Sequence, residues 1–190
     1  LMLLFIASAW RDAEDDRFRL LTVLLYTAVI ASHFFTSVIS GLTVVLIPLL
    51  HPRRFWRTAM ILAGEAGLAL LLMAWWIIPL IAKNEYSMEF GENWNIQLLR
   101  TLPNYAFWLS PLAVLAPILG LRAKHTSVLL FLGMLLIATA LFYFGFDVSP
   151  VFVNVRLWPF LFFAYLALAA IGTGLLARRV RGVELLVFAA

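Results

Sequence analysis

The sequence predicts an all-α protein, a polytopic bundle of transmembrane helices, and three observations support this prediction. Hydrophobic residues make up 64% of the 190 residues and charged residues only 13%. The mean hydropathy is +0.99, far above that of a typical soluble domain. The apolar residues form long unbroken runs without the alternation of a membrane β-barrel. These features exclude a disordered chain and a soluble globular enzyme.

The order of the apolar runs predicts six whole helices and a partial helix at each end, together forming a single transmembrane domain. A helix needs about 20 residues to cross a hydrocarbon core of about 30 Å. Because both terminal runs are too short to cross, the sequence is expected to be a piece of a longer protein. The whole helices are expected at 20–33, 36–50, 58–82, 105–121, 127–146 and 157–177, and the partial helices at 1–10 and 183–190.

The run at 20–50 is long for one helix and short for two, and the basic residues distinguish these interpretations. A hairpin that turns near His33 puts 11 of the 14 Lys and Arg residues on one side of the membrane. A single helix reduces this majority to 8. Because basic loops stay in the cytoplasm, we expect the hairpin, and we read the basic clusters as topology signals and not as a nucleic-acid site. The cytoplasmic loops are then 11–19, 51–57, 122–126 and 178–182, and the main outer loops are 83–104 and 147–156.

The outer loop 83–104 is the longest polar segment. Trp94, Leu98 and Leu102 recur at intervals of four, which predicts a short amphipathic helix at 92–102 lying in the membrane interface. A carboxylate here can serve as a general base or a metal ligand. The alternative is a solvated connector with an aromatic anchor. The carboxylates expected at the outer face are Glu85, Glu89, Glu92 and Asp147.

Two further polar residues are expected at the outer face. His33, at the hairpin turn, can bind phosphate or relay a proton, or it can simply hydrogen-bond within the turn. Arg156 precedes the helix 157–177, whose N-terminus adds partial positive charge and free N–H groups. Together these groups predict a phosphate site. The alternative is that the Arg156 side chain extends to the lipid headgroups.

Acidic residues also occur in one span and in one cytoplasmic loop. Glu65 lies within the predicted span 58–82, among alanines and glycines that allow another helix to approach closely. Because a bare carboxylate in lipid is costly, we expect Glu65 to face the bundle or be protonated. We expect it to hydrogen-bond to a neighbouring helix, with catalysis or a coupling site of a transporter as the alternatives. The acidic run at 12–16 is flanked by arginines, which favours a solvated, internally paired loop over a metal site.

Three short motifs carry a resemblance to a known family: Ser32-His33-Phe-Phe-Thr36, Trp75-Trp76-Ile-Ile-Pro79-Leu and Asn154-Val-Arg156-Leu-Trp-Pro-Phe160. With them the chain resembles the pyruvoyl-tetrahydropterin-synthase-related family of polytopic membrane proteins, a name that does not imply pterin chemistry. These proteins resemble GT-C glycosyltransferases. The resemblance implies a bacterial or archaeal plasma membrane, with membrane lipids and a polyprenyl-phosphate sugar donor as partners.

The resemblance also implies an inverting transfer in which a carboxylate takes the proton of the acceptor hydroxyl while phosphate leaves the donor sugar. Arg156 matches a late-helix arginine suited to the donor phosphate, and His33 matches a polar position near the cavity. The main carboxylate of GT-C enzymes lies in an early outer loop that this sequence does not include. The base therefore stays unassigned, and the cofactor stays open, with a divalent metal compatible. A transporter or flippase that uses Glu65, and a non-catalytic assembly subunit, are the alternatives.

Overall fold

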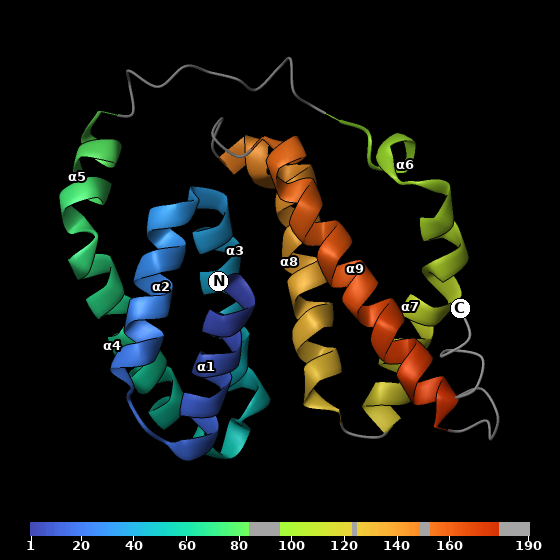
Figure 1. Cartoon of the computed structure of the whole chain (residues 1–190), viewed down its shortest axis with the longest axis horizontal. Coiled ribbons are helices and arrows are strands. Elements are labelled where there is room, and N and C mark those ends of the chain that lie inside the picture. The colour runs from blue at the N-terminus through green and yellow to red at the C-terminus, as the bar shows by residue number, and fades with distance from the viewer. Residues whose placement is uncertain (84–95, 123–124, 149–152, 179–190) are drawn as a thin grey trace. The chain divides into compact units, whose positions relative to one another are not determined.

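The computed structural model describes residues 1–83, 96–122, 125–148 and 153–178. These residues form helices and contain no strand, which confirms the predicted all-α class. The chain divides into two compact units, an N-terminal unit at Leu1–Phe90 and a C-terminal unit at Gly91–Ala190 (Figure 1).

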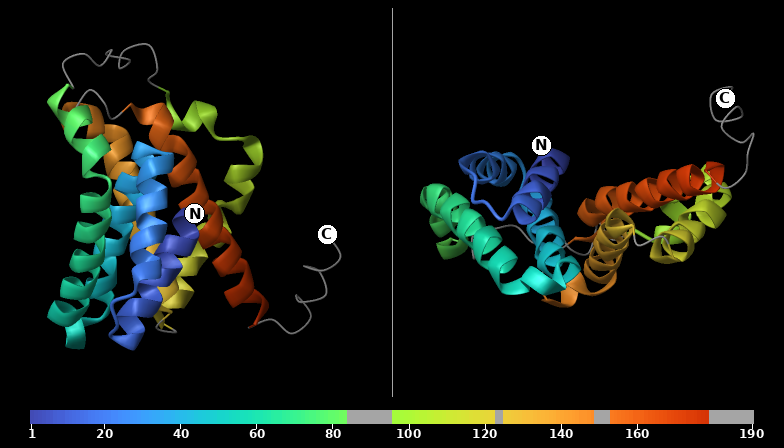
Figure 2. Two further views of the ribbon diagram at one scale, coloured as in Figure 1. Left: turned by 60° about the vertical axis from the view of Figure 1, so that its left-hand side comes forward. Right: turned by 90° about the horizontal axis from the view of Figure 1, so that it is seen from below.

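The N-terminal unit is a bundle in which α1 to α4 lie side by side (Figure 2). Its run at 20–50 forms two helices, with His33 between them at the end opposite the 16–19 linker (Figure 1). This is the hairpin that the distribution of basic residues predicts. The elements are α1 (Met2–Asp15), α2 (Leu20–Ser32), α3 (Phe34–Leu50), η1 (Pro52–Arg54), α4 (Phe55–Leu72) and α5 (Ala74–Ala82).

Helix α1 continues beyond the predicted range 1–10 and reaches Asp15. Two contacts between residues four apart stabilise this extension. Trp10 donates a hydrogen bond of 2.8 Å from Nε1 to Glu14 Oε1, and Arg11 Nε lies 3.9 Å from Asp15 Oδ2. The helix ends at Asp16, whose φ of 55° lies in the left-handed region that commonly terminates helices.

The prediction of one helix at 58–82 was wrong, because the chain bends at Met73 between α4 and α5. Met73 has φ −98° and ψ 3°, outside the helical region, although its N–H still donates to the Ala69 and Leu70 carbonyls. The run also contains Pro79, which lacks an N–H and whose ring crowds the preceding turn. A straight helix through all of this run is therefore disfavoured.

In the C-terminal unit, α9 packs along both α7 and α8. The contact is close because its residues are small: a Cβ added to Gly172 would lie 2.0 Å from the Leu112 carbonyl oxygen. One cluster of buried residues between the helices consists of Ala113, Ala116, Val128, Leu168 and Ala169. The elements are α6 (Leu98–Thr101), α7 (Asn104–Arg122), α8 (Thr126–Val148) and α9 (Asn154–Ala177).

Several boundaries in this unit differ from the prediction. Helix α9 begins at Asn154, so Arg156 lies within its first turn instead of before the helix. Helix α8 reaches Val148, so Asp147 lies in its last turn instead of in a loop. Of the interfacial helix predicted at 92–102, the described part is helical only in α6, while 92–95 and the partial helix at 183–190 fall outside the described residues.

The helices of the described ranges have the length and surface of membrane segments. Four are long and apolar enough to cross a bilayer, namely Pro52–Leu72, α7, α8 and α9. Helices α2 and α3 are apolar but have 13 and 17 residues, so at about 1.5 Å per residue they are shorter than the hydrocarbon core. Large apolar side chains face outward, including Trp56 at 78% and Trp108 at 83% exposure. Such a surface is stable in lipid and unfavourable in water, and it defines an integral membrane protein with several spans.

Candidate functional site

The first turn of α9 is joined to Ile96, in the polar segment 83–104, by a single side chain. Asn154 accepts a hydrogen bond from the Ile96 N–H at 2.9 Å and donates one from Nδ2 to the Ile96 carbonyl at 3.0 Å. This pairing satisfies both backbone groups of Ile96. It therefore fixes the segment before α6 against the start of α9, although the two are 58 residues apart in the sequence.

Arg156 lies in this same turn of α9. Its side chain is exposed, and its backbone N–H donates to the Val153 carbonyl at 3.1 Å. A helix N-terminus carries partial positive charge, and the guanidinium adds a full charge in a planar array of donors. The turn can therefore bind a phosphate group, and the Asn154 pairing places the end of the 83–104 loop beside it.

The turns of α9 that follow its first turn are held to α7 by polar and aromatic contacts. Tyr165 donates a hydrogen bond to the Ala106 carbonyl, and its hydroxyl lies 2.9 Å from Ser110 Oγ. Phe162 stacks on Trp158 with ring centroids 4.8 Å apart and contacts Tyr105 at 6.2 Å. These contacts fix the rotation of α9 about its axis, which sets the direction in which its first turn presents Arg156.

His33 is placed as the N-cap of α3. Its Nδ1 accepts a hydrogen bond from the Thr36 N–H at 3.3 Å and lies 3.2 Å from the Thr36 hydroxyl. An Nδ1 that accepts from a backbone N–H carries no hydrogen, so in this geometry the ring hydrogen is on Nε2. His33 belongs to the N-terminal unit and Arg156 to the C-terminal unit, and each is described within its own unit.

The predicted outer carboxylates are only partly described. Asp147 is exposed in the last turn of α8, where an acidic group receives no support from the helix dipole. Glu85, Glu89 and Glu92 lie outside the described residues. Within the described ranges, no group of three or more His, Cys, Asp or Glu side chains is arranged to hold a metal ion.

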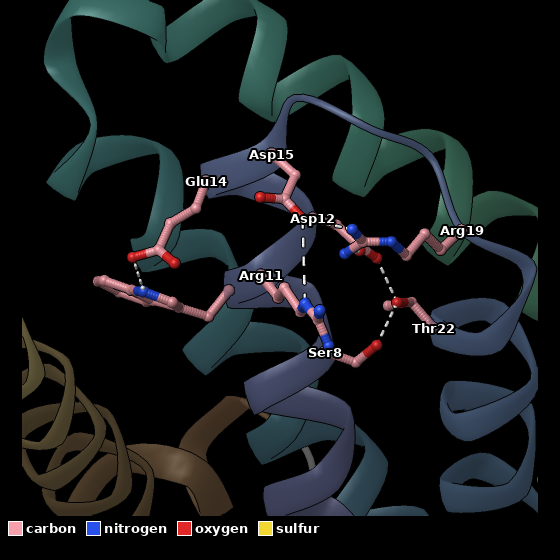
Figure 3. A network of polar contacts seen from close by, with 8 residues as sticks. Ser8, Arg11, Asp12, Glu14, Asp15, Arg19 and Thr22 are labelled. Atoms are coloured by element: carbon pink, nitrogen blue, oxygen red, sulfur yellow. Dashed lines mark hydrogen bonds and ion pairs between the residues drawn. The ribbon is translucent and has the colours of Figure 1, made fainter.

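A second polar cluster lies in the N-terminal unit, where α1 meets the start of α2 (Figure 3). Asp12 is 0% exposed, although the acidic run at 12–16 was expected to be solvated. Its Oδ1 accepts a hydrogen bond of 2.6 Å from Arg19 Nη1, and its Oδ2 accepts one from the Thr22 hydroxyl. The Thr22 hydroxyl also lies 2.6 Å from Ser8 Oγ. The cluster joins two helices through buried hydrogen bonds.

Asp15 and Asp16 form ion pairs nearer to the surface. The hydrogen bond from Arg19 lowers the pKa of the Asp15 carboxyl from its ordinary value of 3.8, against a smaller opposing effect of desolvation. Asp16 pairs with Arg54 at 3.0 Å and with Arg57 at 3.6 Å. These pairs bring the basic linker at 16–19 and the basic turn at 51–57 to the same end of this unit, as the charge distribution predicts.

Glu65 lies in the same cluster and is 2% exposed. Its Oε1 accepts a hydrogen bond of 2.9 Å from the backbone N–H of Arg19, which joins α4 to the linker between α1 and α2. Arg19 thus bonds to both acids, to Glu65 through its backbone N–H and to Asp12 through its guanidinium. The second oxygen, Oε2, is buried and accepts no hydrogen bond from a donor of the described residues.

Two residues of these clusters were missed in the sequence, and each had a detectable signal. Asp12 follows Phe5 and Ala9 at helical spacing, and these three residues share the buried face of α1. Asn154 comes directly before an apolar run, a position that is typical of a helix N-terminus. What the sequence could not supply was the partner of each side chain.

The comparisons with known proteins add no family to this description. No family model, no curated protein and no solved structure matches the chain. The fold and its apolar surface define the class, which is a multi-pass integral membrane protein with α-helical spans.

Proposed function

We propose that the chain is part of a GT-C-like glycosyltransferase that takes its sugar from a polyprenyl-phosphate donor at the outer face of a bacterial or archaeal plasma membrane. One observation carries the proposal: Asn154 pairs with the backbone of Ile96 and so joins the Arg156 turn to the outer polar loop. A phosphate-binding cation and a segment rich in carboxylates are the two components that such a transfer needs. The resemblance of the three sequence motifs to this class supports the same assignment.

In the proposed reaction, Arg156 binds the phosphate that links the sugar to the lipid. A carboxylate takes the proton of the acceptor hydroxyl, whose oxygen attacks the anomeric carbon. The bond between the anomeric carbon and the phosphate oxygen breaks with inversion, and its electron pair leaves on the phosphate. The guanidinium stabilises the negative charge that collects on the leaving phosphate. The candidates for the base within this chain are Glu85, Glu89, Glu92 and Asp147.

The first test is binding of a polyprenyl phosphate to the purified protein in detergent. A hydrogen bond to a charged group contributes about 1.5–3 kcal/mol, so we expect Arg156→Ala to weaken binding by about tenfold or more. Arg156→Lys keeps the charge but loses the planar fork, and it is expected to bind with intermediate affinity. The measurement is the Kd from native mass spectrometry or a fluorescent polyprenyl-phosphate analogue.

Arg100→Ala is the matched control, because Arg100 is an exposed arginine of the same unit, in α6. It is expected to bind the lipid as the wild type does. The same variants are then assayed for sugar transfer in membranes that carry the full-length protein. Equal binding and transfer by Arg156→Ala and the wild type, at equal expression, would remove Arg156 from the mechanism and this proposal with it.

A further inference from the structure

The buried carboxyl groups of Asp12 and Glu65 form a pair that the proposed transfer does not use. Asp12 is on α1 and Glu65 on α4, and they are 0% and 2% exposed. Both accept hydrogen bonds from Arg19, Asp12 from its guanidinium at 2.6 Å and Glu65 from its backbone N–H at 2.9 Å. Two ionised carboxylates are both acceptors, so neither can donate to the other, and their charges repel.

The donors around the pair are unequally distributed. Asp12 accepts hydrogen bonds on both oxygens, from the Arg19 guanidinium and from the Thr22 hydroxyl. Glu65 accepts one hydrogen bond, from the backbone N–H of Arg19, and its Oε2 accepts none from the described residues. A proton on Glu65 Oε2 would supply the missing donor, with Asp12 as its acceptor.

The charges of the surrounding elements lead to the same conclusion. The nearby cation is Arg19, which is shared by Asp12 and the exposed Asp15. Asp16 pairs with Arg54 and Arg57. Helix α2 contributes Thr22 and has Tyr26 as its one titratable residue, whose hydroxyl donates to the Ser37 carbonyl, and α3 has no charged residue. The buried pair therefore carries one negative charge in excess when both acids are ionised.

The location of Glu65 adds an energetic reason. Glu65 lies within the segment Pro52–Leu72, which is long and apolar enough to span a bilayer. An ionised carboxylate within such a segment is costly, and a neutral carboxylic acid costs far less. One bound proton would neutralise the excess charge and complete the hydrogen bonding of the pair. The absence of a third acidic or histidine ligand in the described ranges disfavours a metal ion at this position.

We propose that Asp12 and Glu65 form a proton-binding site, in which a single proton on Glu65 is hydrogen-bonded to the Asp12 carboxylate and joins α1 to α4. The site is independent of the phosphate-binding role proposed for Arg156. Loss of this proton leaves two facing carboxylates in the buried cluster and loosens the contact between α1 and α4. Proton binding is thereby coupled to the packing of the N-terminal unit.

Infrared spectroscopy of the full chain in lipid bilayers tests the site, because a protonated carboxyl gives a C=O band distinct from that of a carboxylate. We expect this band at neutral pH in the wild type and in Glu14→Gln, which changes an exposed acid of α1. We expect the band to be lost in Glu65→Gln, whose amide can donate to Asp12 in place of the proton. A band that persists in folded Glu65→Gln overturns the proposal.

Isotope labelling decides the question if Glu65→Gln does not fold. Wild-type protein labelled with carboxyl ¹³C in glutamate is expected to show an isotopic shift of the band, whereas labelling of aspartate leaves it in place. A shift with labelled aspartate instead would contradict the assignment of the proton to Glu65. Absence of the band, together with a Tm that rises in sodium chloride but not in choline chloride, would overturn the proposal in favour of a monovalent cation.

Discussion

Buried polar side chains are distributed unequally between the two units. In the N-terminal unit they are Asp12, Thr22, Ser37, Ser40, Thr43, Thr58 and Glu65. Among the described residues of the C-terminal unit, no polar or charged side chain is fully buried. Its helices pack mainly through alanine, glycine and larger apolar residues, with the half-buried Tyr165 hydroxyl bonded to α7. Helices in lipid associate both through hydrogen bonds between polar side chains and through close packing of small residues.

The comparison shows how helix length relates to these two kinds of helix association, hydrogen bonding between polar side chains and close packing of small residues. The C-terminal helices have 19 to 24 residues and are each long enough to cross the bilayer, so their contact extends over many turns. Helices α2 and α3 are shorter, with 13 and 17 residues. Short helices offer less area for packing, and directional hydrogen bonds such as that of Thr22 with Asp12 supply specificity in a small contact.

The largest loss of stability is expected from Gly172→Ala in the C-terminal unit. The new Cβ would lie 2.0 Å from the Leu112 carbonyl oxygen and 2.9 Å from its carbon, and backbone atoms cannot move aside without separating α7 from α9. We expect the free energy of unfolding to fall by about 3 kcal/mol. The measurement is an SDS titration of the detergent-solubilised protein followed by circular dichroism.

Gly174→Ala is the matched control for this substitution, since a Cβ there meets no atom within 4 Å. It should change the free energy of unfolding by less than about 1 kcal/mol. Equal destabilisation by the two alanine variants would show that close packing of α9 on α7 does not hold the C-terminal unit together.

The second-largest loss of stability is expected in the N-terminal unit, where hydrogen bonds between polar side chains hold helices together. Thr22→Val keeps the shape of the side chain but removes the hydroxyl that donates to the buried Asp12 carboxylate. Because hydrogen bonds to charged groups contribute about 1.5–3 kcal/mol, we expect a loss of about 2 kcal/mol in the same SDS titration. Thr27→Val is the control, since the Thr27 hydroxyl donates to the Val23 carbonyl of its own helix. A loss no larger for Thr22→Val than for Thr27→Val would count against the buried cluster as a source of stability.

The smallest effect on stability is expected from Asp15, the exposed acid of the same cluster. The hydrogen bond from Arg19 holds the pKa of Asp15 below 3.8 in the folded protein. The folded state thus binds this proton less tightly than the unfolded state, so the stabilisation is present above pH 3.8 and is lost as the pH falls through the folded pKa. We expect Asp15→Asn to remove this acid dependence while changing stability at neutral pH less than Thr22→Val does, because the side chain is 43% exposed.

The check is the free energy of unfolding of the wild type and Asp15→Asn, measured at neutral pH and in acid, at low and high salt. The difference between the two proteins should shrink in acid and in high salt. A difference that is unaffected by salt would indicate that Asp15 belongs functionally to the buried cluster and not to the surface.

Much of the architecture was predictable because hydropathy and charge are local properties of the chain. The all-α class followed from the long apolar runs, and the break at His33 followed from the count of basic residues on each side. The bend at Met73 was missed, since hydropathy does not change across it. The start of α9 at Asn154 was also missed, because polar residues of a first turn resemble loop residues in a hydropathy profile.

The candidate sites were less predictable than the helices. Arg156 and Glu65 could be selected individually, because an arginine at an outer helix end and an acid in a span are each unusual. The burial of Asp12 was not expected, since its neighbours in the sequence are charged. Its position on the apolar face of α1 is visible only once α1 is known to continue to Asp15.

The sequence by itself determined that this protein is helical and resides in a membrane. Long apolar runs without alternation can satisfy their backbone hydrogen bonds in lipid as helices. The tertiary structure alone decided which polar groups meet: Arg19 with Glu65, 46 residues apart, and Ile96 with Asn154, 58 residues apart. These contacts depend on the rotation and axial shift of one helix against another. Packing sets both quantities, and a pattern of apolar and polar residues along a single chain does not specify them.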